Sequence, residues 1–166
     1  MKSLGITAER LLLPIDLANC PLEVFPLAAR FTRPVGGEIV LLHVLDRRPG
    51  RGQPLAGELE HRRAERHLRR LGRDHLRFPA QPCFRVRAGI PHEEIVAEAS
   101  AQNADLILLP VFAPSIWRRM VGCGYGATAR SLVARASCRI FVVDVRRRFN
   151  CLRRWAVEEA FGLCAT

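Results

Sequence analysis

Two apolar runs without a polar residue, Leu106–Leu109 and Ile140–Val143, constrain the fold of this chain more than any other feature of its sequence. A strand with one face in water alternates apolar and polar residues, and these two runs do not alternate. They therefore predict strands that are covered on both faces, as in a parallel sheet between two layers of helices.

The rest of the chain alternates predicted strands with predicted helices. An apolar run at Arg10–Asp16, a second at Glu38–Leu45 and the alternating segment Cys83–Ala88 predict three more strands, the last at a sheet edge. Helical spacing predicts four helices: one that begins near Asn19 and Pro21, Leu55–Leu76, one that begins at Pro91, and Ala127–Ala136. Pro26 falls inside the first helix and should kink it or delay its start.

Strands that alternate with helices predict a doubly wound parallel sheet with right-handed crossovers. The 166 residues suffice for one such α/β domain, which we place at residues 1–145. Residues 146–166 form a separate basic tail, in which Arg146–Arg148 precede a predicted amphipathic helix capped by Asn150 and ended near Gly162. Such a helix docks on its own domain or on a dimer mate, or binds a membrane or a partner through its basic cluster.

Composition narrows the class of protein. No run approaches the roughly 18 apolar residues of a membrane span, and Pro14 and Asp16 break the first apolar run too early for a secretory signal, so we expect a cytoplasmic protein. None of the six cysteines is spaced for zinc, so we expect reduced thiols and no metal site. The net charge is +10, and Lys2 is the one basic residue, histidines aside, that is not arginine. This charge is typical of proteins that bind nucleic acid, an anionic membrane or polyphosphate ligands. A GC-rich genome, which encodes arginine in place of lysine, explains it equally well.

Two segments are candidate parts of a binding site. Asp16 stands at the C-terminal end of the first strand, where open parallel sheets bind ligands, although an acid there equally serves as a turn or capping residue. Gly122, Gly124 and Gly126 lead into the helix at Ala127, and the free N–H groups of a helix N-terminus can hold a phosphate.

Four segments together resemble a universal stress protein domain: RLLLPID, EIVLLHV, AGIPHEEIVAEASAQNADLILLP and GATARSLVARASCRIFVVDV. The resemblance covers Arg10 to Val145. It implies a five-stranded parallel sheet of order 3-2-1-4-5 with helices on both faces. It also implies a small cytoplasmic stress-response protein, usually a homodimer.

The resemblance also implies a nucleotide site with two unequal halves. Asp16 matches the acid that contacts the nucleoside, and Val44 matches the residue whose backbone meets adenine. Glycines of the family's phosphate loop fall here on Pro110, Ala113 and Gly126, and Ala127 replaces a Ser or Thr. Pro110 has no N–H and Ala127 has no hydroxyl, so the phosphate half is degenerate. The Gly122–Gly126 segment with Arg130 is either a substitute for this half or a loop that has lost its ligand. As a substitute it gives the candidate nucleotide-binding residues Asp16, Val44, Gly124, Gly126, Ala127 and Arg130.

Three functions follow as hypotheses. The first is a non-enzymatic stress-response binding module with a degenerate nucleotide site. The second is a switch that binds ATP, with Mg²⁺, and the third is a nucleic-acid or membrane-surface adaptor that uses the arginine-rich tail. Neither an HxGH nor an SGGxDS motif nor a catalytic triad is found, so we do not expect an enzyme. The apolar edge strand Ile140–Val145 needs a cover, which either a second subunit or the tail helix can supply.

Overall fold

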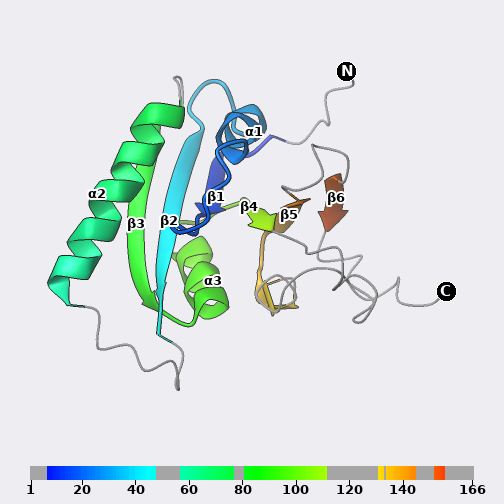
Figure 1. Cartoon of the computed structure of the whole chain (residues 1–166). Coiled ribbons are helices and arrows are strands. Elements are labelled where there is room, and N and C mark those ends of the chain that lie inside the picture. Colours follow the sequence, from blue (N-terminus) through cyan, green and yellow to red (C-terminus); the bar gives the residue numbers. More distant parts are fainter. Residues whose placement is uncertain are drawn as a thin grey trace.

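The computed structural model describes residues 7–47, 57–76, 81–111, 131–132, 134–144 and 152–155. Its centre is a six-stranded sheet of order β3-β2-β1-β4-β5-β6 (Figure 1). The strands are β1 (Arg10–Pro14), β2 (Glu38–Asp46), β3 (Gln81–Gly89), β4 (Leu106–Val111), β5 (Arg139–Asp144) and β6 (Leu152–Trp155). The first five strands are mutually parallel, which confirms the predicted sheet and its order 3-2-1-4-5.

Helices cover both faces of this sheet, as the apolar runs predict. Helices α1 (Val24–Phe31) and α2 (Glu58–His75) share one apolar cluster with Leu11, Leu13 and Leu41. Helix α3 (Pro91–Ala101) shares the opposite cluster with Leu12 and Leu42, and this cluster also contains Leu132 and Ala136 of the predicted fourth helix. Neighbouring residues of one strand thus face opposite layers. None of the helices in the described segments combines the length and the apolar content of a membrane span.

Pro26 delays the start of the first helix. Helix α1 begins at Val24, so Pro26 is its third residue, in the turn where backbone N–H groups have no partner inside the helix. The residues before it form turns instead, in which Val24 N donates to Pro21 O at 3.2 Å. The proline therefore costs the helix no hydrogen bond.

Asp105 ties the N-terminal ends of three strands together. Its Oδ2 accepts the backbone N–H of Glu9 at 3.0 Å and its Oδ1 that of Arg10 at 3.1 Å, while Arg139 Nη2 lies 3.6 Å from Oδ2. One carboxylate thus accepts hydrogen bonds from two backbone N–H groups at the start of β1. The residue that opens the central predicted strand therefore also anchors β1.

The tail differs from the prediction. Leu152–Trp155, expected inside a helix, form strand β6, which pairs antiparallel with β5 from Ile140↔Trp155 to Val143↔Leu152. The reason is the row of unpaired backbone N–H and C=O groups at the β5 edge, which a strand satisfies and a docked helix does not. The predicted cover thus comes from the tail, as a strand. A homodimer through Ile140–Val145 remains a proposal, and it requires β6 to leave this edge.

Candidate functional site

The candidate site lies where the strand order reverses. Strands β1 and β4 are neighbours in space, but β1 continues to β2 and β4 continues to β5, so their crossovers diverge at the C-terminal edge of the sheet. Ligands of open α/β sheets bind at this crevice. Residues that follow the ends of β1, β2 and β4 are therefore the first to inspect.

The C-terminal ends of β1 and β2 are joined by backbone and side-chain hydrogen bonds. Ile15 N donates to Leu42 O at 2.8 Å, which extends the parallel ladder one residue past β1. Since Pro14 is in register with Leu42, Val44 lies two residues further along β2 at the same edge as Asp16. The structure therefore places Asp16, two residues past the end of β1, and Val44, on the adjacent strand β2, at the same edge of the sheet.

Asp16 is exposed and holds the turn that follows β1. Its Oδ1 accepts the backbone N–H of Ala18 at 3.0 Å, and its Oδ2 accepts the side-chain amide of Asn19 at 3.1 Å. The turn role considered from the sequence is thus real. A carboxylate offers about four lone-pair sites, so these two bonds leave acceptor capacity for hydroxyl groups of a ligand. The turn also fixes the direction in which that capacity points.

His43 is the residue of this edge whose role the sequence did not reveal. Its Nδ1 lies 2.9 Å from Ile15 O. Because a carbonyl oxygen only accepts, Nδ1 is the donor in this contact. His43 is half-buried, and its contact fixes the backbone that precedes Asp16.

Cys20 lies close enough to Asp16 for the carboxylate to act on its thiol. Burial, then the charges of Asp16 and Glu23, raise the pKa of Cys20 to about 11. The thiol is half-buried against the apolar cluster of α1 and α2. It is therefore protonated at neutral pH and is not an activated nucleophile.

The phosphate half is described only at its beginning. Pro110 is half-buried in β4, in register with Val143, and lacks the N–H that a glycine would present there. The remaining predicted residues of this half lie outside the described residues: Ala113, Gly124, Gly126, Ala127 and Arg130. The structure thus brings Asp16 and Val44 together and leaves the predicted phosphate loop as a prediction.

Solved structures with this fold are numerous, and three illustrate the likeness. Hypothetical protein MJ0577 superposes with a TM-score of 0.66 at 20% identity, covering 84% of this chain and 97% of its own. Universal stress protein UspA from Lactobacillus plantarum gives 0.59 at 20% identity, with 84% and 99% covered. A universal stress protein in complex with cAMP gives 0.54 at 16% identity, with 84% and 98% covered.

None of the curated proteins compared with the chain matches it significantly. The sequence model of the Universal stress protein family, in contrast, matches residues 7–144, which include the whole five-stranded parallel sheet and both residues of the described candidate site. The fold, the strand order and this match agree, and the chain belongs to the universal stress protein family.

Proposed function

We propose that this protein is a non-enzymatic regulatory module that binds an adenine nucleotide mainly through the nucleoside. One observation carries the proposal. The turn after β1 holds the exposed Asp16 carboxylate at the switch point beside Val44, with acceptor capacity to spare for ribose hydroxyls.

The phosphate side supplies little of the binding energy in this proposal. Pro110 at the end of β4 offers no N–H to a phosphate oxygen, and Ala113 and Ala127 stand where the family has glycine and a hydroxyl residue. The fold relative that was solved with cAMP supports the same view at the level of the fold, because its ligand carries one phosphate and no triphosphate chain. We expect adenosine, AMP and Mg-ATP to bind with dissociation constants within about threefold of one another. If the phosphates contributed to binding, each 1.4 kcal/mol that they added would make the dissociation constant of ATP about tenfold lower than that of adenosine.

Ligand-induced thermal stabilisation tests the proposal directly. A ligand at about a hundred times its dissociation constant adds on the order of 2.7 kcal/mol, which should raise the Tm of a chain of this size by roughly 5–10 °C. Adenosine, AMP and Mg-ATP should give similar shifts, whereas GTP and inorganic triphosphate should give none. Asp16→Asn keeps the size of the side chain and removes its charge, so it should lower the shift caused by adenosine.

Asp74→Asn is the matched control, since it makes the same chemical change on α2, away from the switch point. It should leave the adenosine shift unchanged. Stabilisation by ATP alone would instead favour an ATP switch that uses the Gly122–Gly126 segment and Mg²⁺. Equal shifts with triphosphate and ATP would show that the basic surface binds the phosphates, and the absence of any shift would overturn the proposal.

A further inference from the structure

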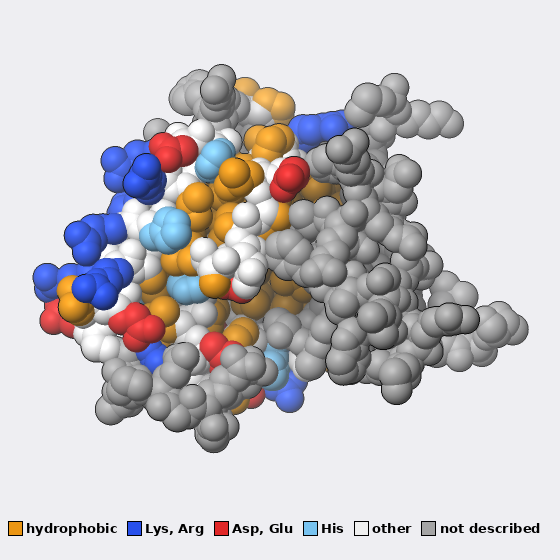
Figure 2. Space-filling view, viewed as in Figure 1, with side chains coloured by type: hydrophobic (Ala, Val, Ile, Leu, Met, Phe, Trp, Pro, Cys, Tyr) orange, Lys and Arg blue, Asp and Glu red, His pale blue; other side chains and the backbone are white. Residues whose placement is uncertain are grey.

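The outer face of helix α2 carries an aligned row of arginines that the candidate nucleotide site does not use. Arg63, Arg66, Arg70 and Arg73 are all exposed and are separated by three, four and three residues. We call these four residues the α2 arginine row. Figure 2 shows blue side chains gathered over the part of the surface that α2 occupies in Figure 1.

The packing of α2 fixes the direction of this row. Ala64, Leu68 and Gly72 are buried against the sheet, with Gly72 in close approach to Phe84 and Leu41. Each residue turns an α-helix by about 100°, so the mean direction of the α2 arginine row is about 180° from that of the three buried residues. The row therefore points straight away from the protein body.

Acidic residues on α2 neutralise a different row of arginines. Arg62 pairs with Glu58, and Arg69 pairs with Glu65 at 2.7 Å, both at i,i+4 spacing. Within the described part of the chain, Arg63, Arg66 and Arg73 have no acidic partner, and Arg70 has only Asp74 at 3.6 Å. Charges on one side of the helix are balanced, whereas three of the four arginines on its outermost side have no acidic partner among the described residues and can meet an external anion.

Stability does not explain this placement. Arg66 and Arg70 are an i,i+4 pair of like charge, and such pairs destabilise a helix by a few tenths of a kcal/mol. A preference of the genome for arginine codons explains why arginine stands in place of lysine, but not why positive charges line one face without acids between them. A ligand that spans the row would compensate the repulsion.

We propose that the α2 arginine row binds the phosphate backbone of double-stranded nucleic acid. The row is about 15 Å long at 1.5 Å per residue, and a duplex carries one negative charge per about 1.7 Å of its axis, so each guanidinium can meet a phosphate. Arginine binds phosphate oxygens in a bidentate way. The overall charge of +10 strengthens the attraction at a distance.

The same helix argues against a membrane as the partner. An interfacial helix inserts its apolar face into the lipid, but the apolar face of α2 is already used against the sheet. Only Leu59 offers an exposed large apolar side chain on the outer side of α2. Helix α2 contains no Asn, Gln, Ser or Thr that would read base edges alongside arginine, so binding should depend little on the base sequence.

Fluorescence anisotropy of the full chain with a labelled DNA duplex of about 20 base pairs, longer than the row, tests this proposal. The affinity should fall steeply between about 50 and 200 mM salt, because each phosphate contact contributes about −0.9 to the slope of log K against log salt. In the variant Arg63→Gln/Arg66→Gln the slope should become shallower by about 1.8, and binding at low salt should weaken on the order of tenfold.

The control variant Arg62→Gln/Arg69→Gln removes the same charge from the same helix, but from the residues that Glu58 and Glu65 neutralise. It should retain most of the affinity, and Arg63→Lys/Arg66→Lys should retain the slope. Equal losses in both Gln variants would overturn the proposal in favour of a general charge effect. Binding to vesicles of anionic phospholipid with none to the duplex, or a loss only when residues 146–166 are removed, would overturn it as well.

Discussion

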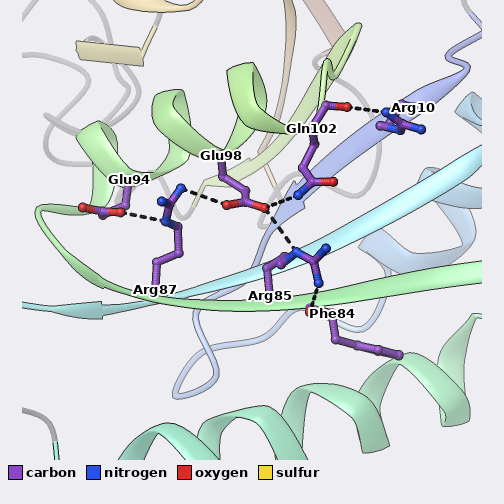
Figure 3. Close-up of polar contacts among 7 residues, drawn as sticks. All are labelled: Arg10, Phe84, Arg85, Arg87, Glu94, Glu98 and Gln102. Atoms are coloured by element: carbon purple, nitrogen blue, oxygen red, sulfur yellow. Dashed lines mark hydrogen bonds and ion pairs between the residues drawn. The ribbon is translucent and has the colours of Figure 1, made fainter.

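Glu98 on helix α3 accepts a hydrogen bond from Arg87 on the edge strand β3, with Oε2 2.9 Å from Nη1 (Figure 3). Glu98 as a residue is 4% exposed. Its other oxygen accepts from Gln102 Nε2 at 2.8 Å and lies 3.5 Å from Arg85 Nε. A buried acid is tolerated only with such partners, so this contact holds the outer strand of the sheet to the helix that covers it.

Removal of the arginine should therefore destabilise the protein. Loss of one partner of a buried ion pair costs about 3–5 kcal/mol, and since Arg87 is itself 34% exposed and Arg85 remains, we expect about 2 kcal/mol for Arg87→Gln. Chemical denaturation measures this difference. Arg62→Gln, which breaks an exposed pair on α2, should change the free energy of unfolding by less than about 0.5 kcal/mol. In the double variant Arg87→Gln/Glu98→Gln the two losses should not add, and full additivity would show that the pair is not coupled.

The close approach of α2 to the sheet gives a second prediction. A Cβ at position 72 would lie 2.4 Å from Phe84 Cε1 and 2.9 Å from Leu41 Cδ1. Alanine is the better helix former by about 1 kcal/mol, but overpacking costs about 1–3 kcal/mol, so we expect Gly72→Ala to be destabilising by about 1 kcal/mol. Phe84→Leu should make room for the new methyl group. Gly72→Ala should accordingly cost less in a Phe84→Leu background, and an equal cost in both would contradict the proposed contact.

The sheet could be predicted from the sequence because burial on both faces leaves a direct mark. Leu106–Leu109 and Ile140–Val143 contain no polar residue, and both are strands between two helical layers. Strand β6 could not be predicted in the same way. The spacing of apolar residues around Leu152 fits a helix, and only the unpaired edge of β5, which belongs to a distant part of the fold, favours a strand there.

The sequence indicates which residues lie at the ends of strands, but it does not indicate contacts between elements. Asp16 is indicated by its place at the end of the first predicted strand, whereas Val44 comes only from the family resemblance. The structure brings both residues to the same edge of the sheet, and their role in binding stays a prediction. The contact of His43 with Ile15 O joins two strands and has no signal in the sequence. Glu98 is similar: it is buried on α3 with Ile95 and Ala99 because arginines of β3 reach it, and no pattern in the sequence indicates that contact.

The thiol of Cys20 supplies a prediction about reactivity. Since burial and Asp16 raise its pKa to about 11, the folded protein holds it protonated at pH 8. The rate of alkylation of Cys20 can be followed by mass spectrometry of its peptide. It should be at least about tenfold lower in the folded chain than in the chain unfolded by denaturant. This factor already allows for the higher nucleophilicity of a more basic thiolate. Equal rates in the two states would contradict the raised pKa.

The same shift fixes the sign of a pH dependence. The thiol of the unfolded chain ionises near its ordinary pKa of 9.0, whereas the folded thiol ionises near 11. The stabilising contribution is therefore fully present below pH 9 and is lost as the pH rises through the folded value. Asp16→Asn removes one of the charges that raise the pKa, so it should shift the alkylation profile of Cys20 to lower pH.

Strand β6 covers the outer edge of β5. Its backbone pairs with Ile140–Val143, so a chain that ends at Val145 would present this apolar edge unpaired. Because unpaired edges of this kind recruit another strand, we expect the shortened chain to dimerise at a protein concentration at least about tenfold lower than the full chain does. Sedimentation velocity over a range of concentrations measures the difference. If the full and shortened chains associate equally, β6 does not guard this edge, and a homodimer of the protein must use another surface.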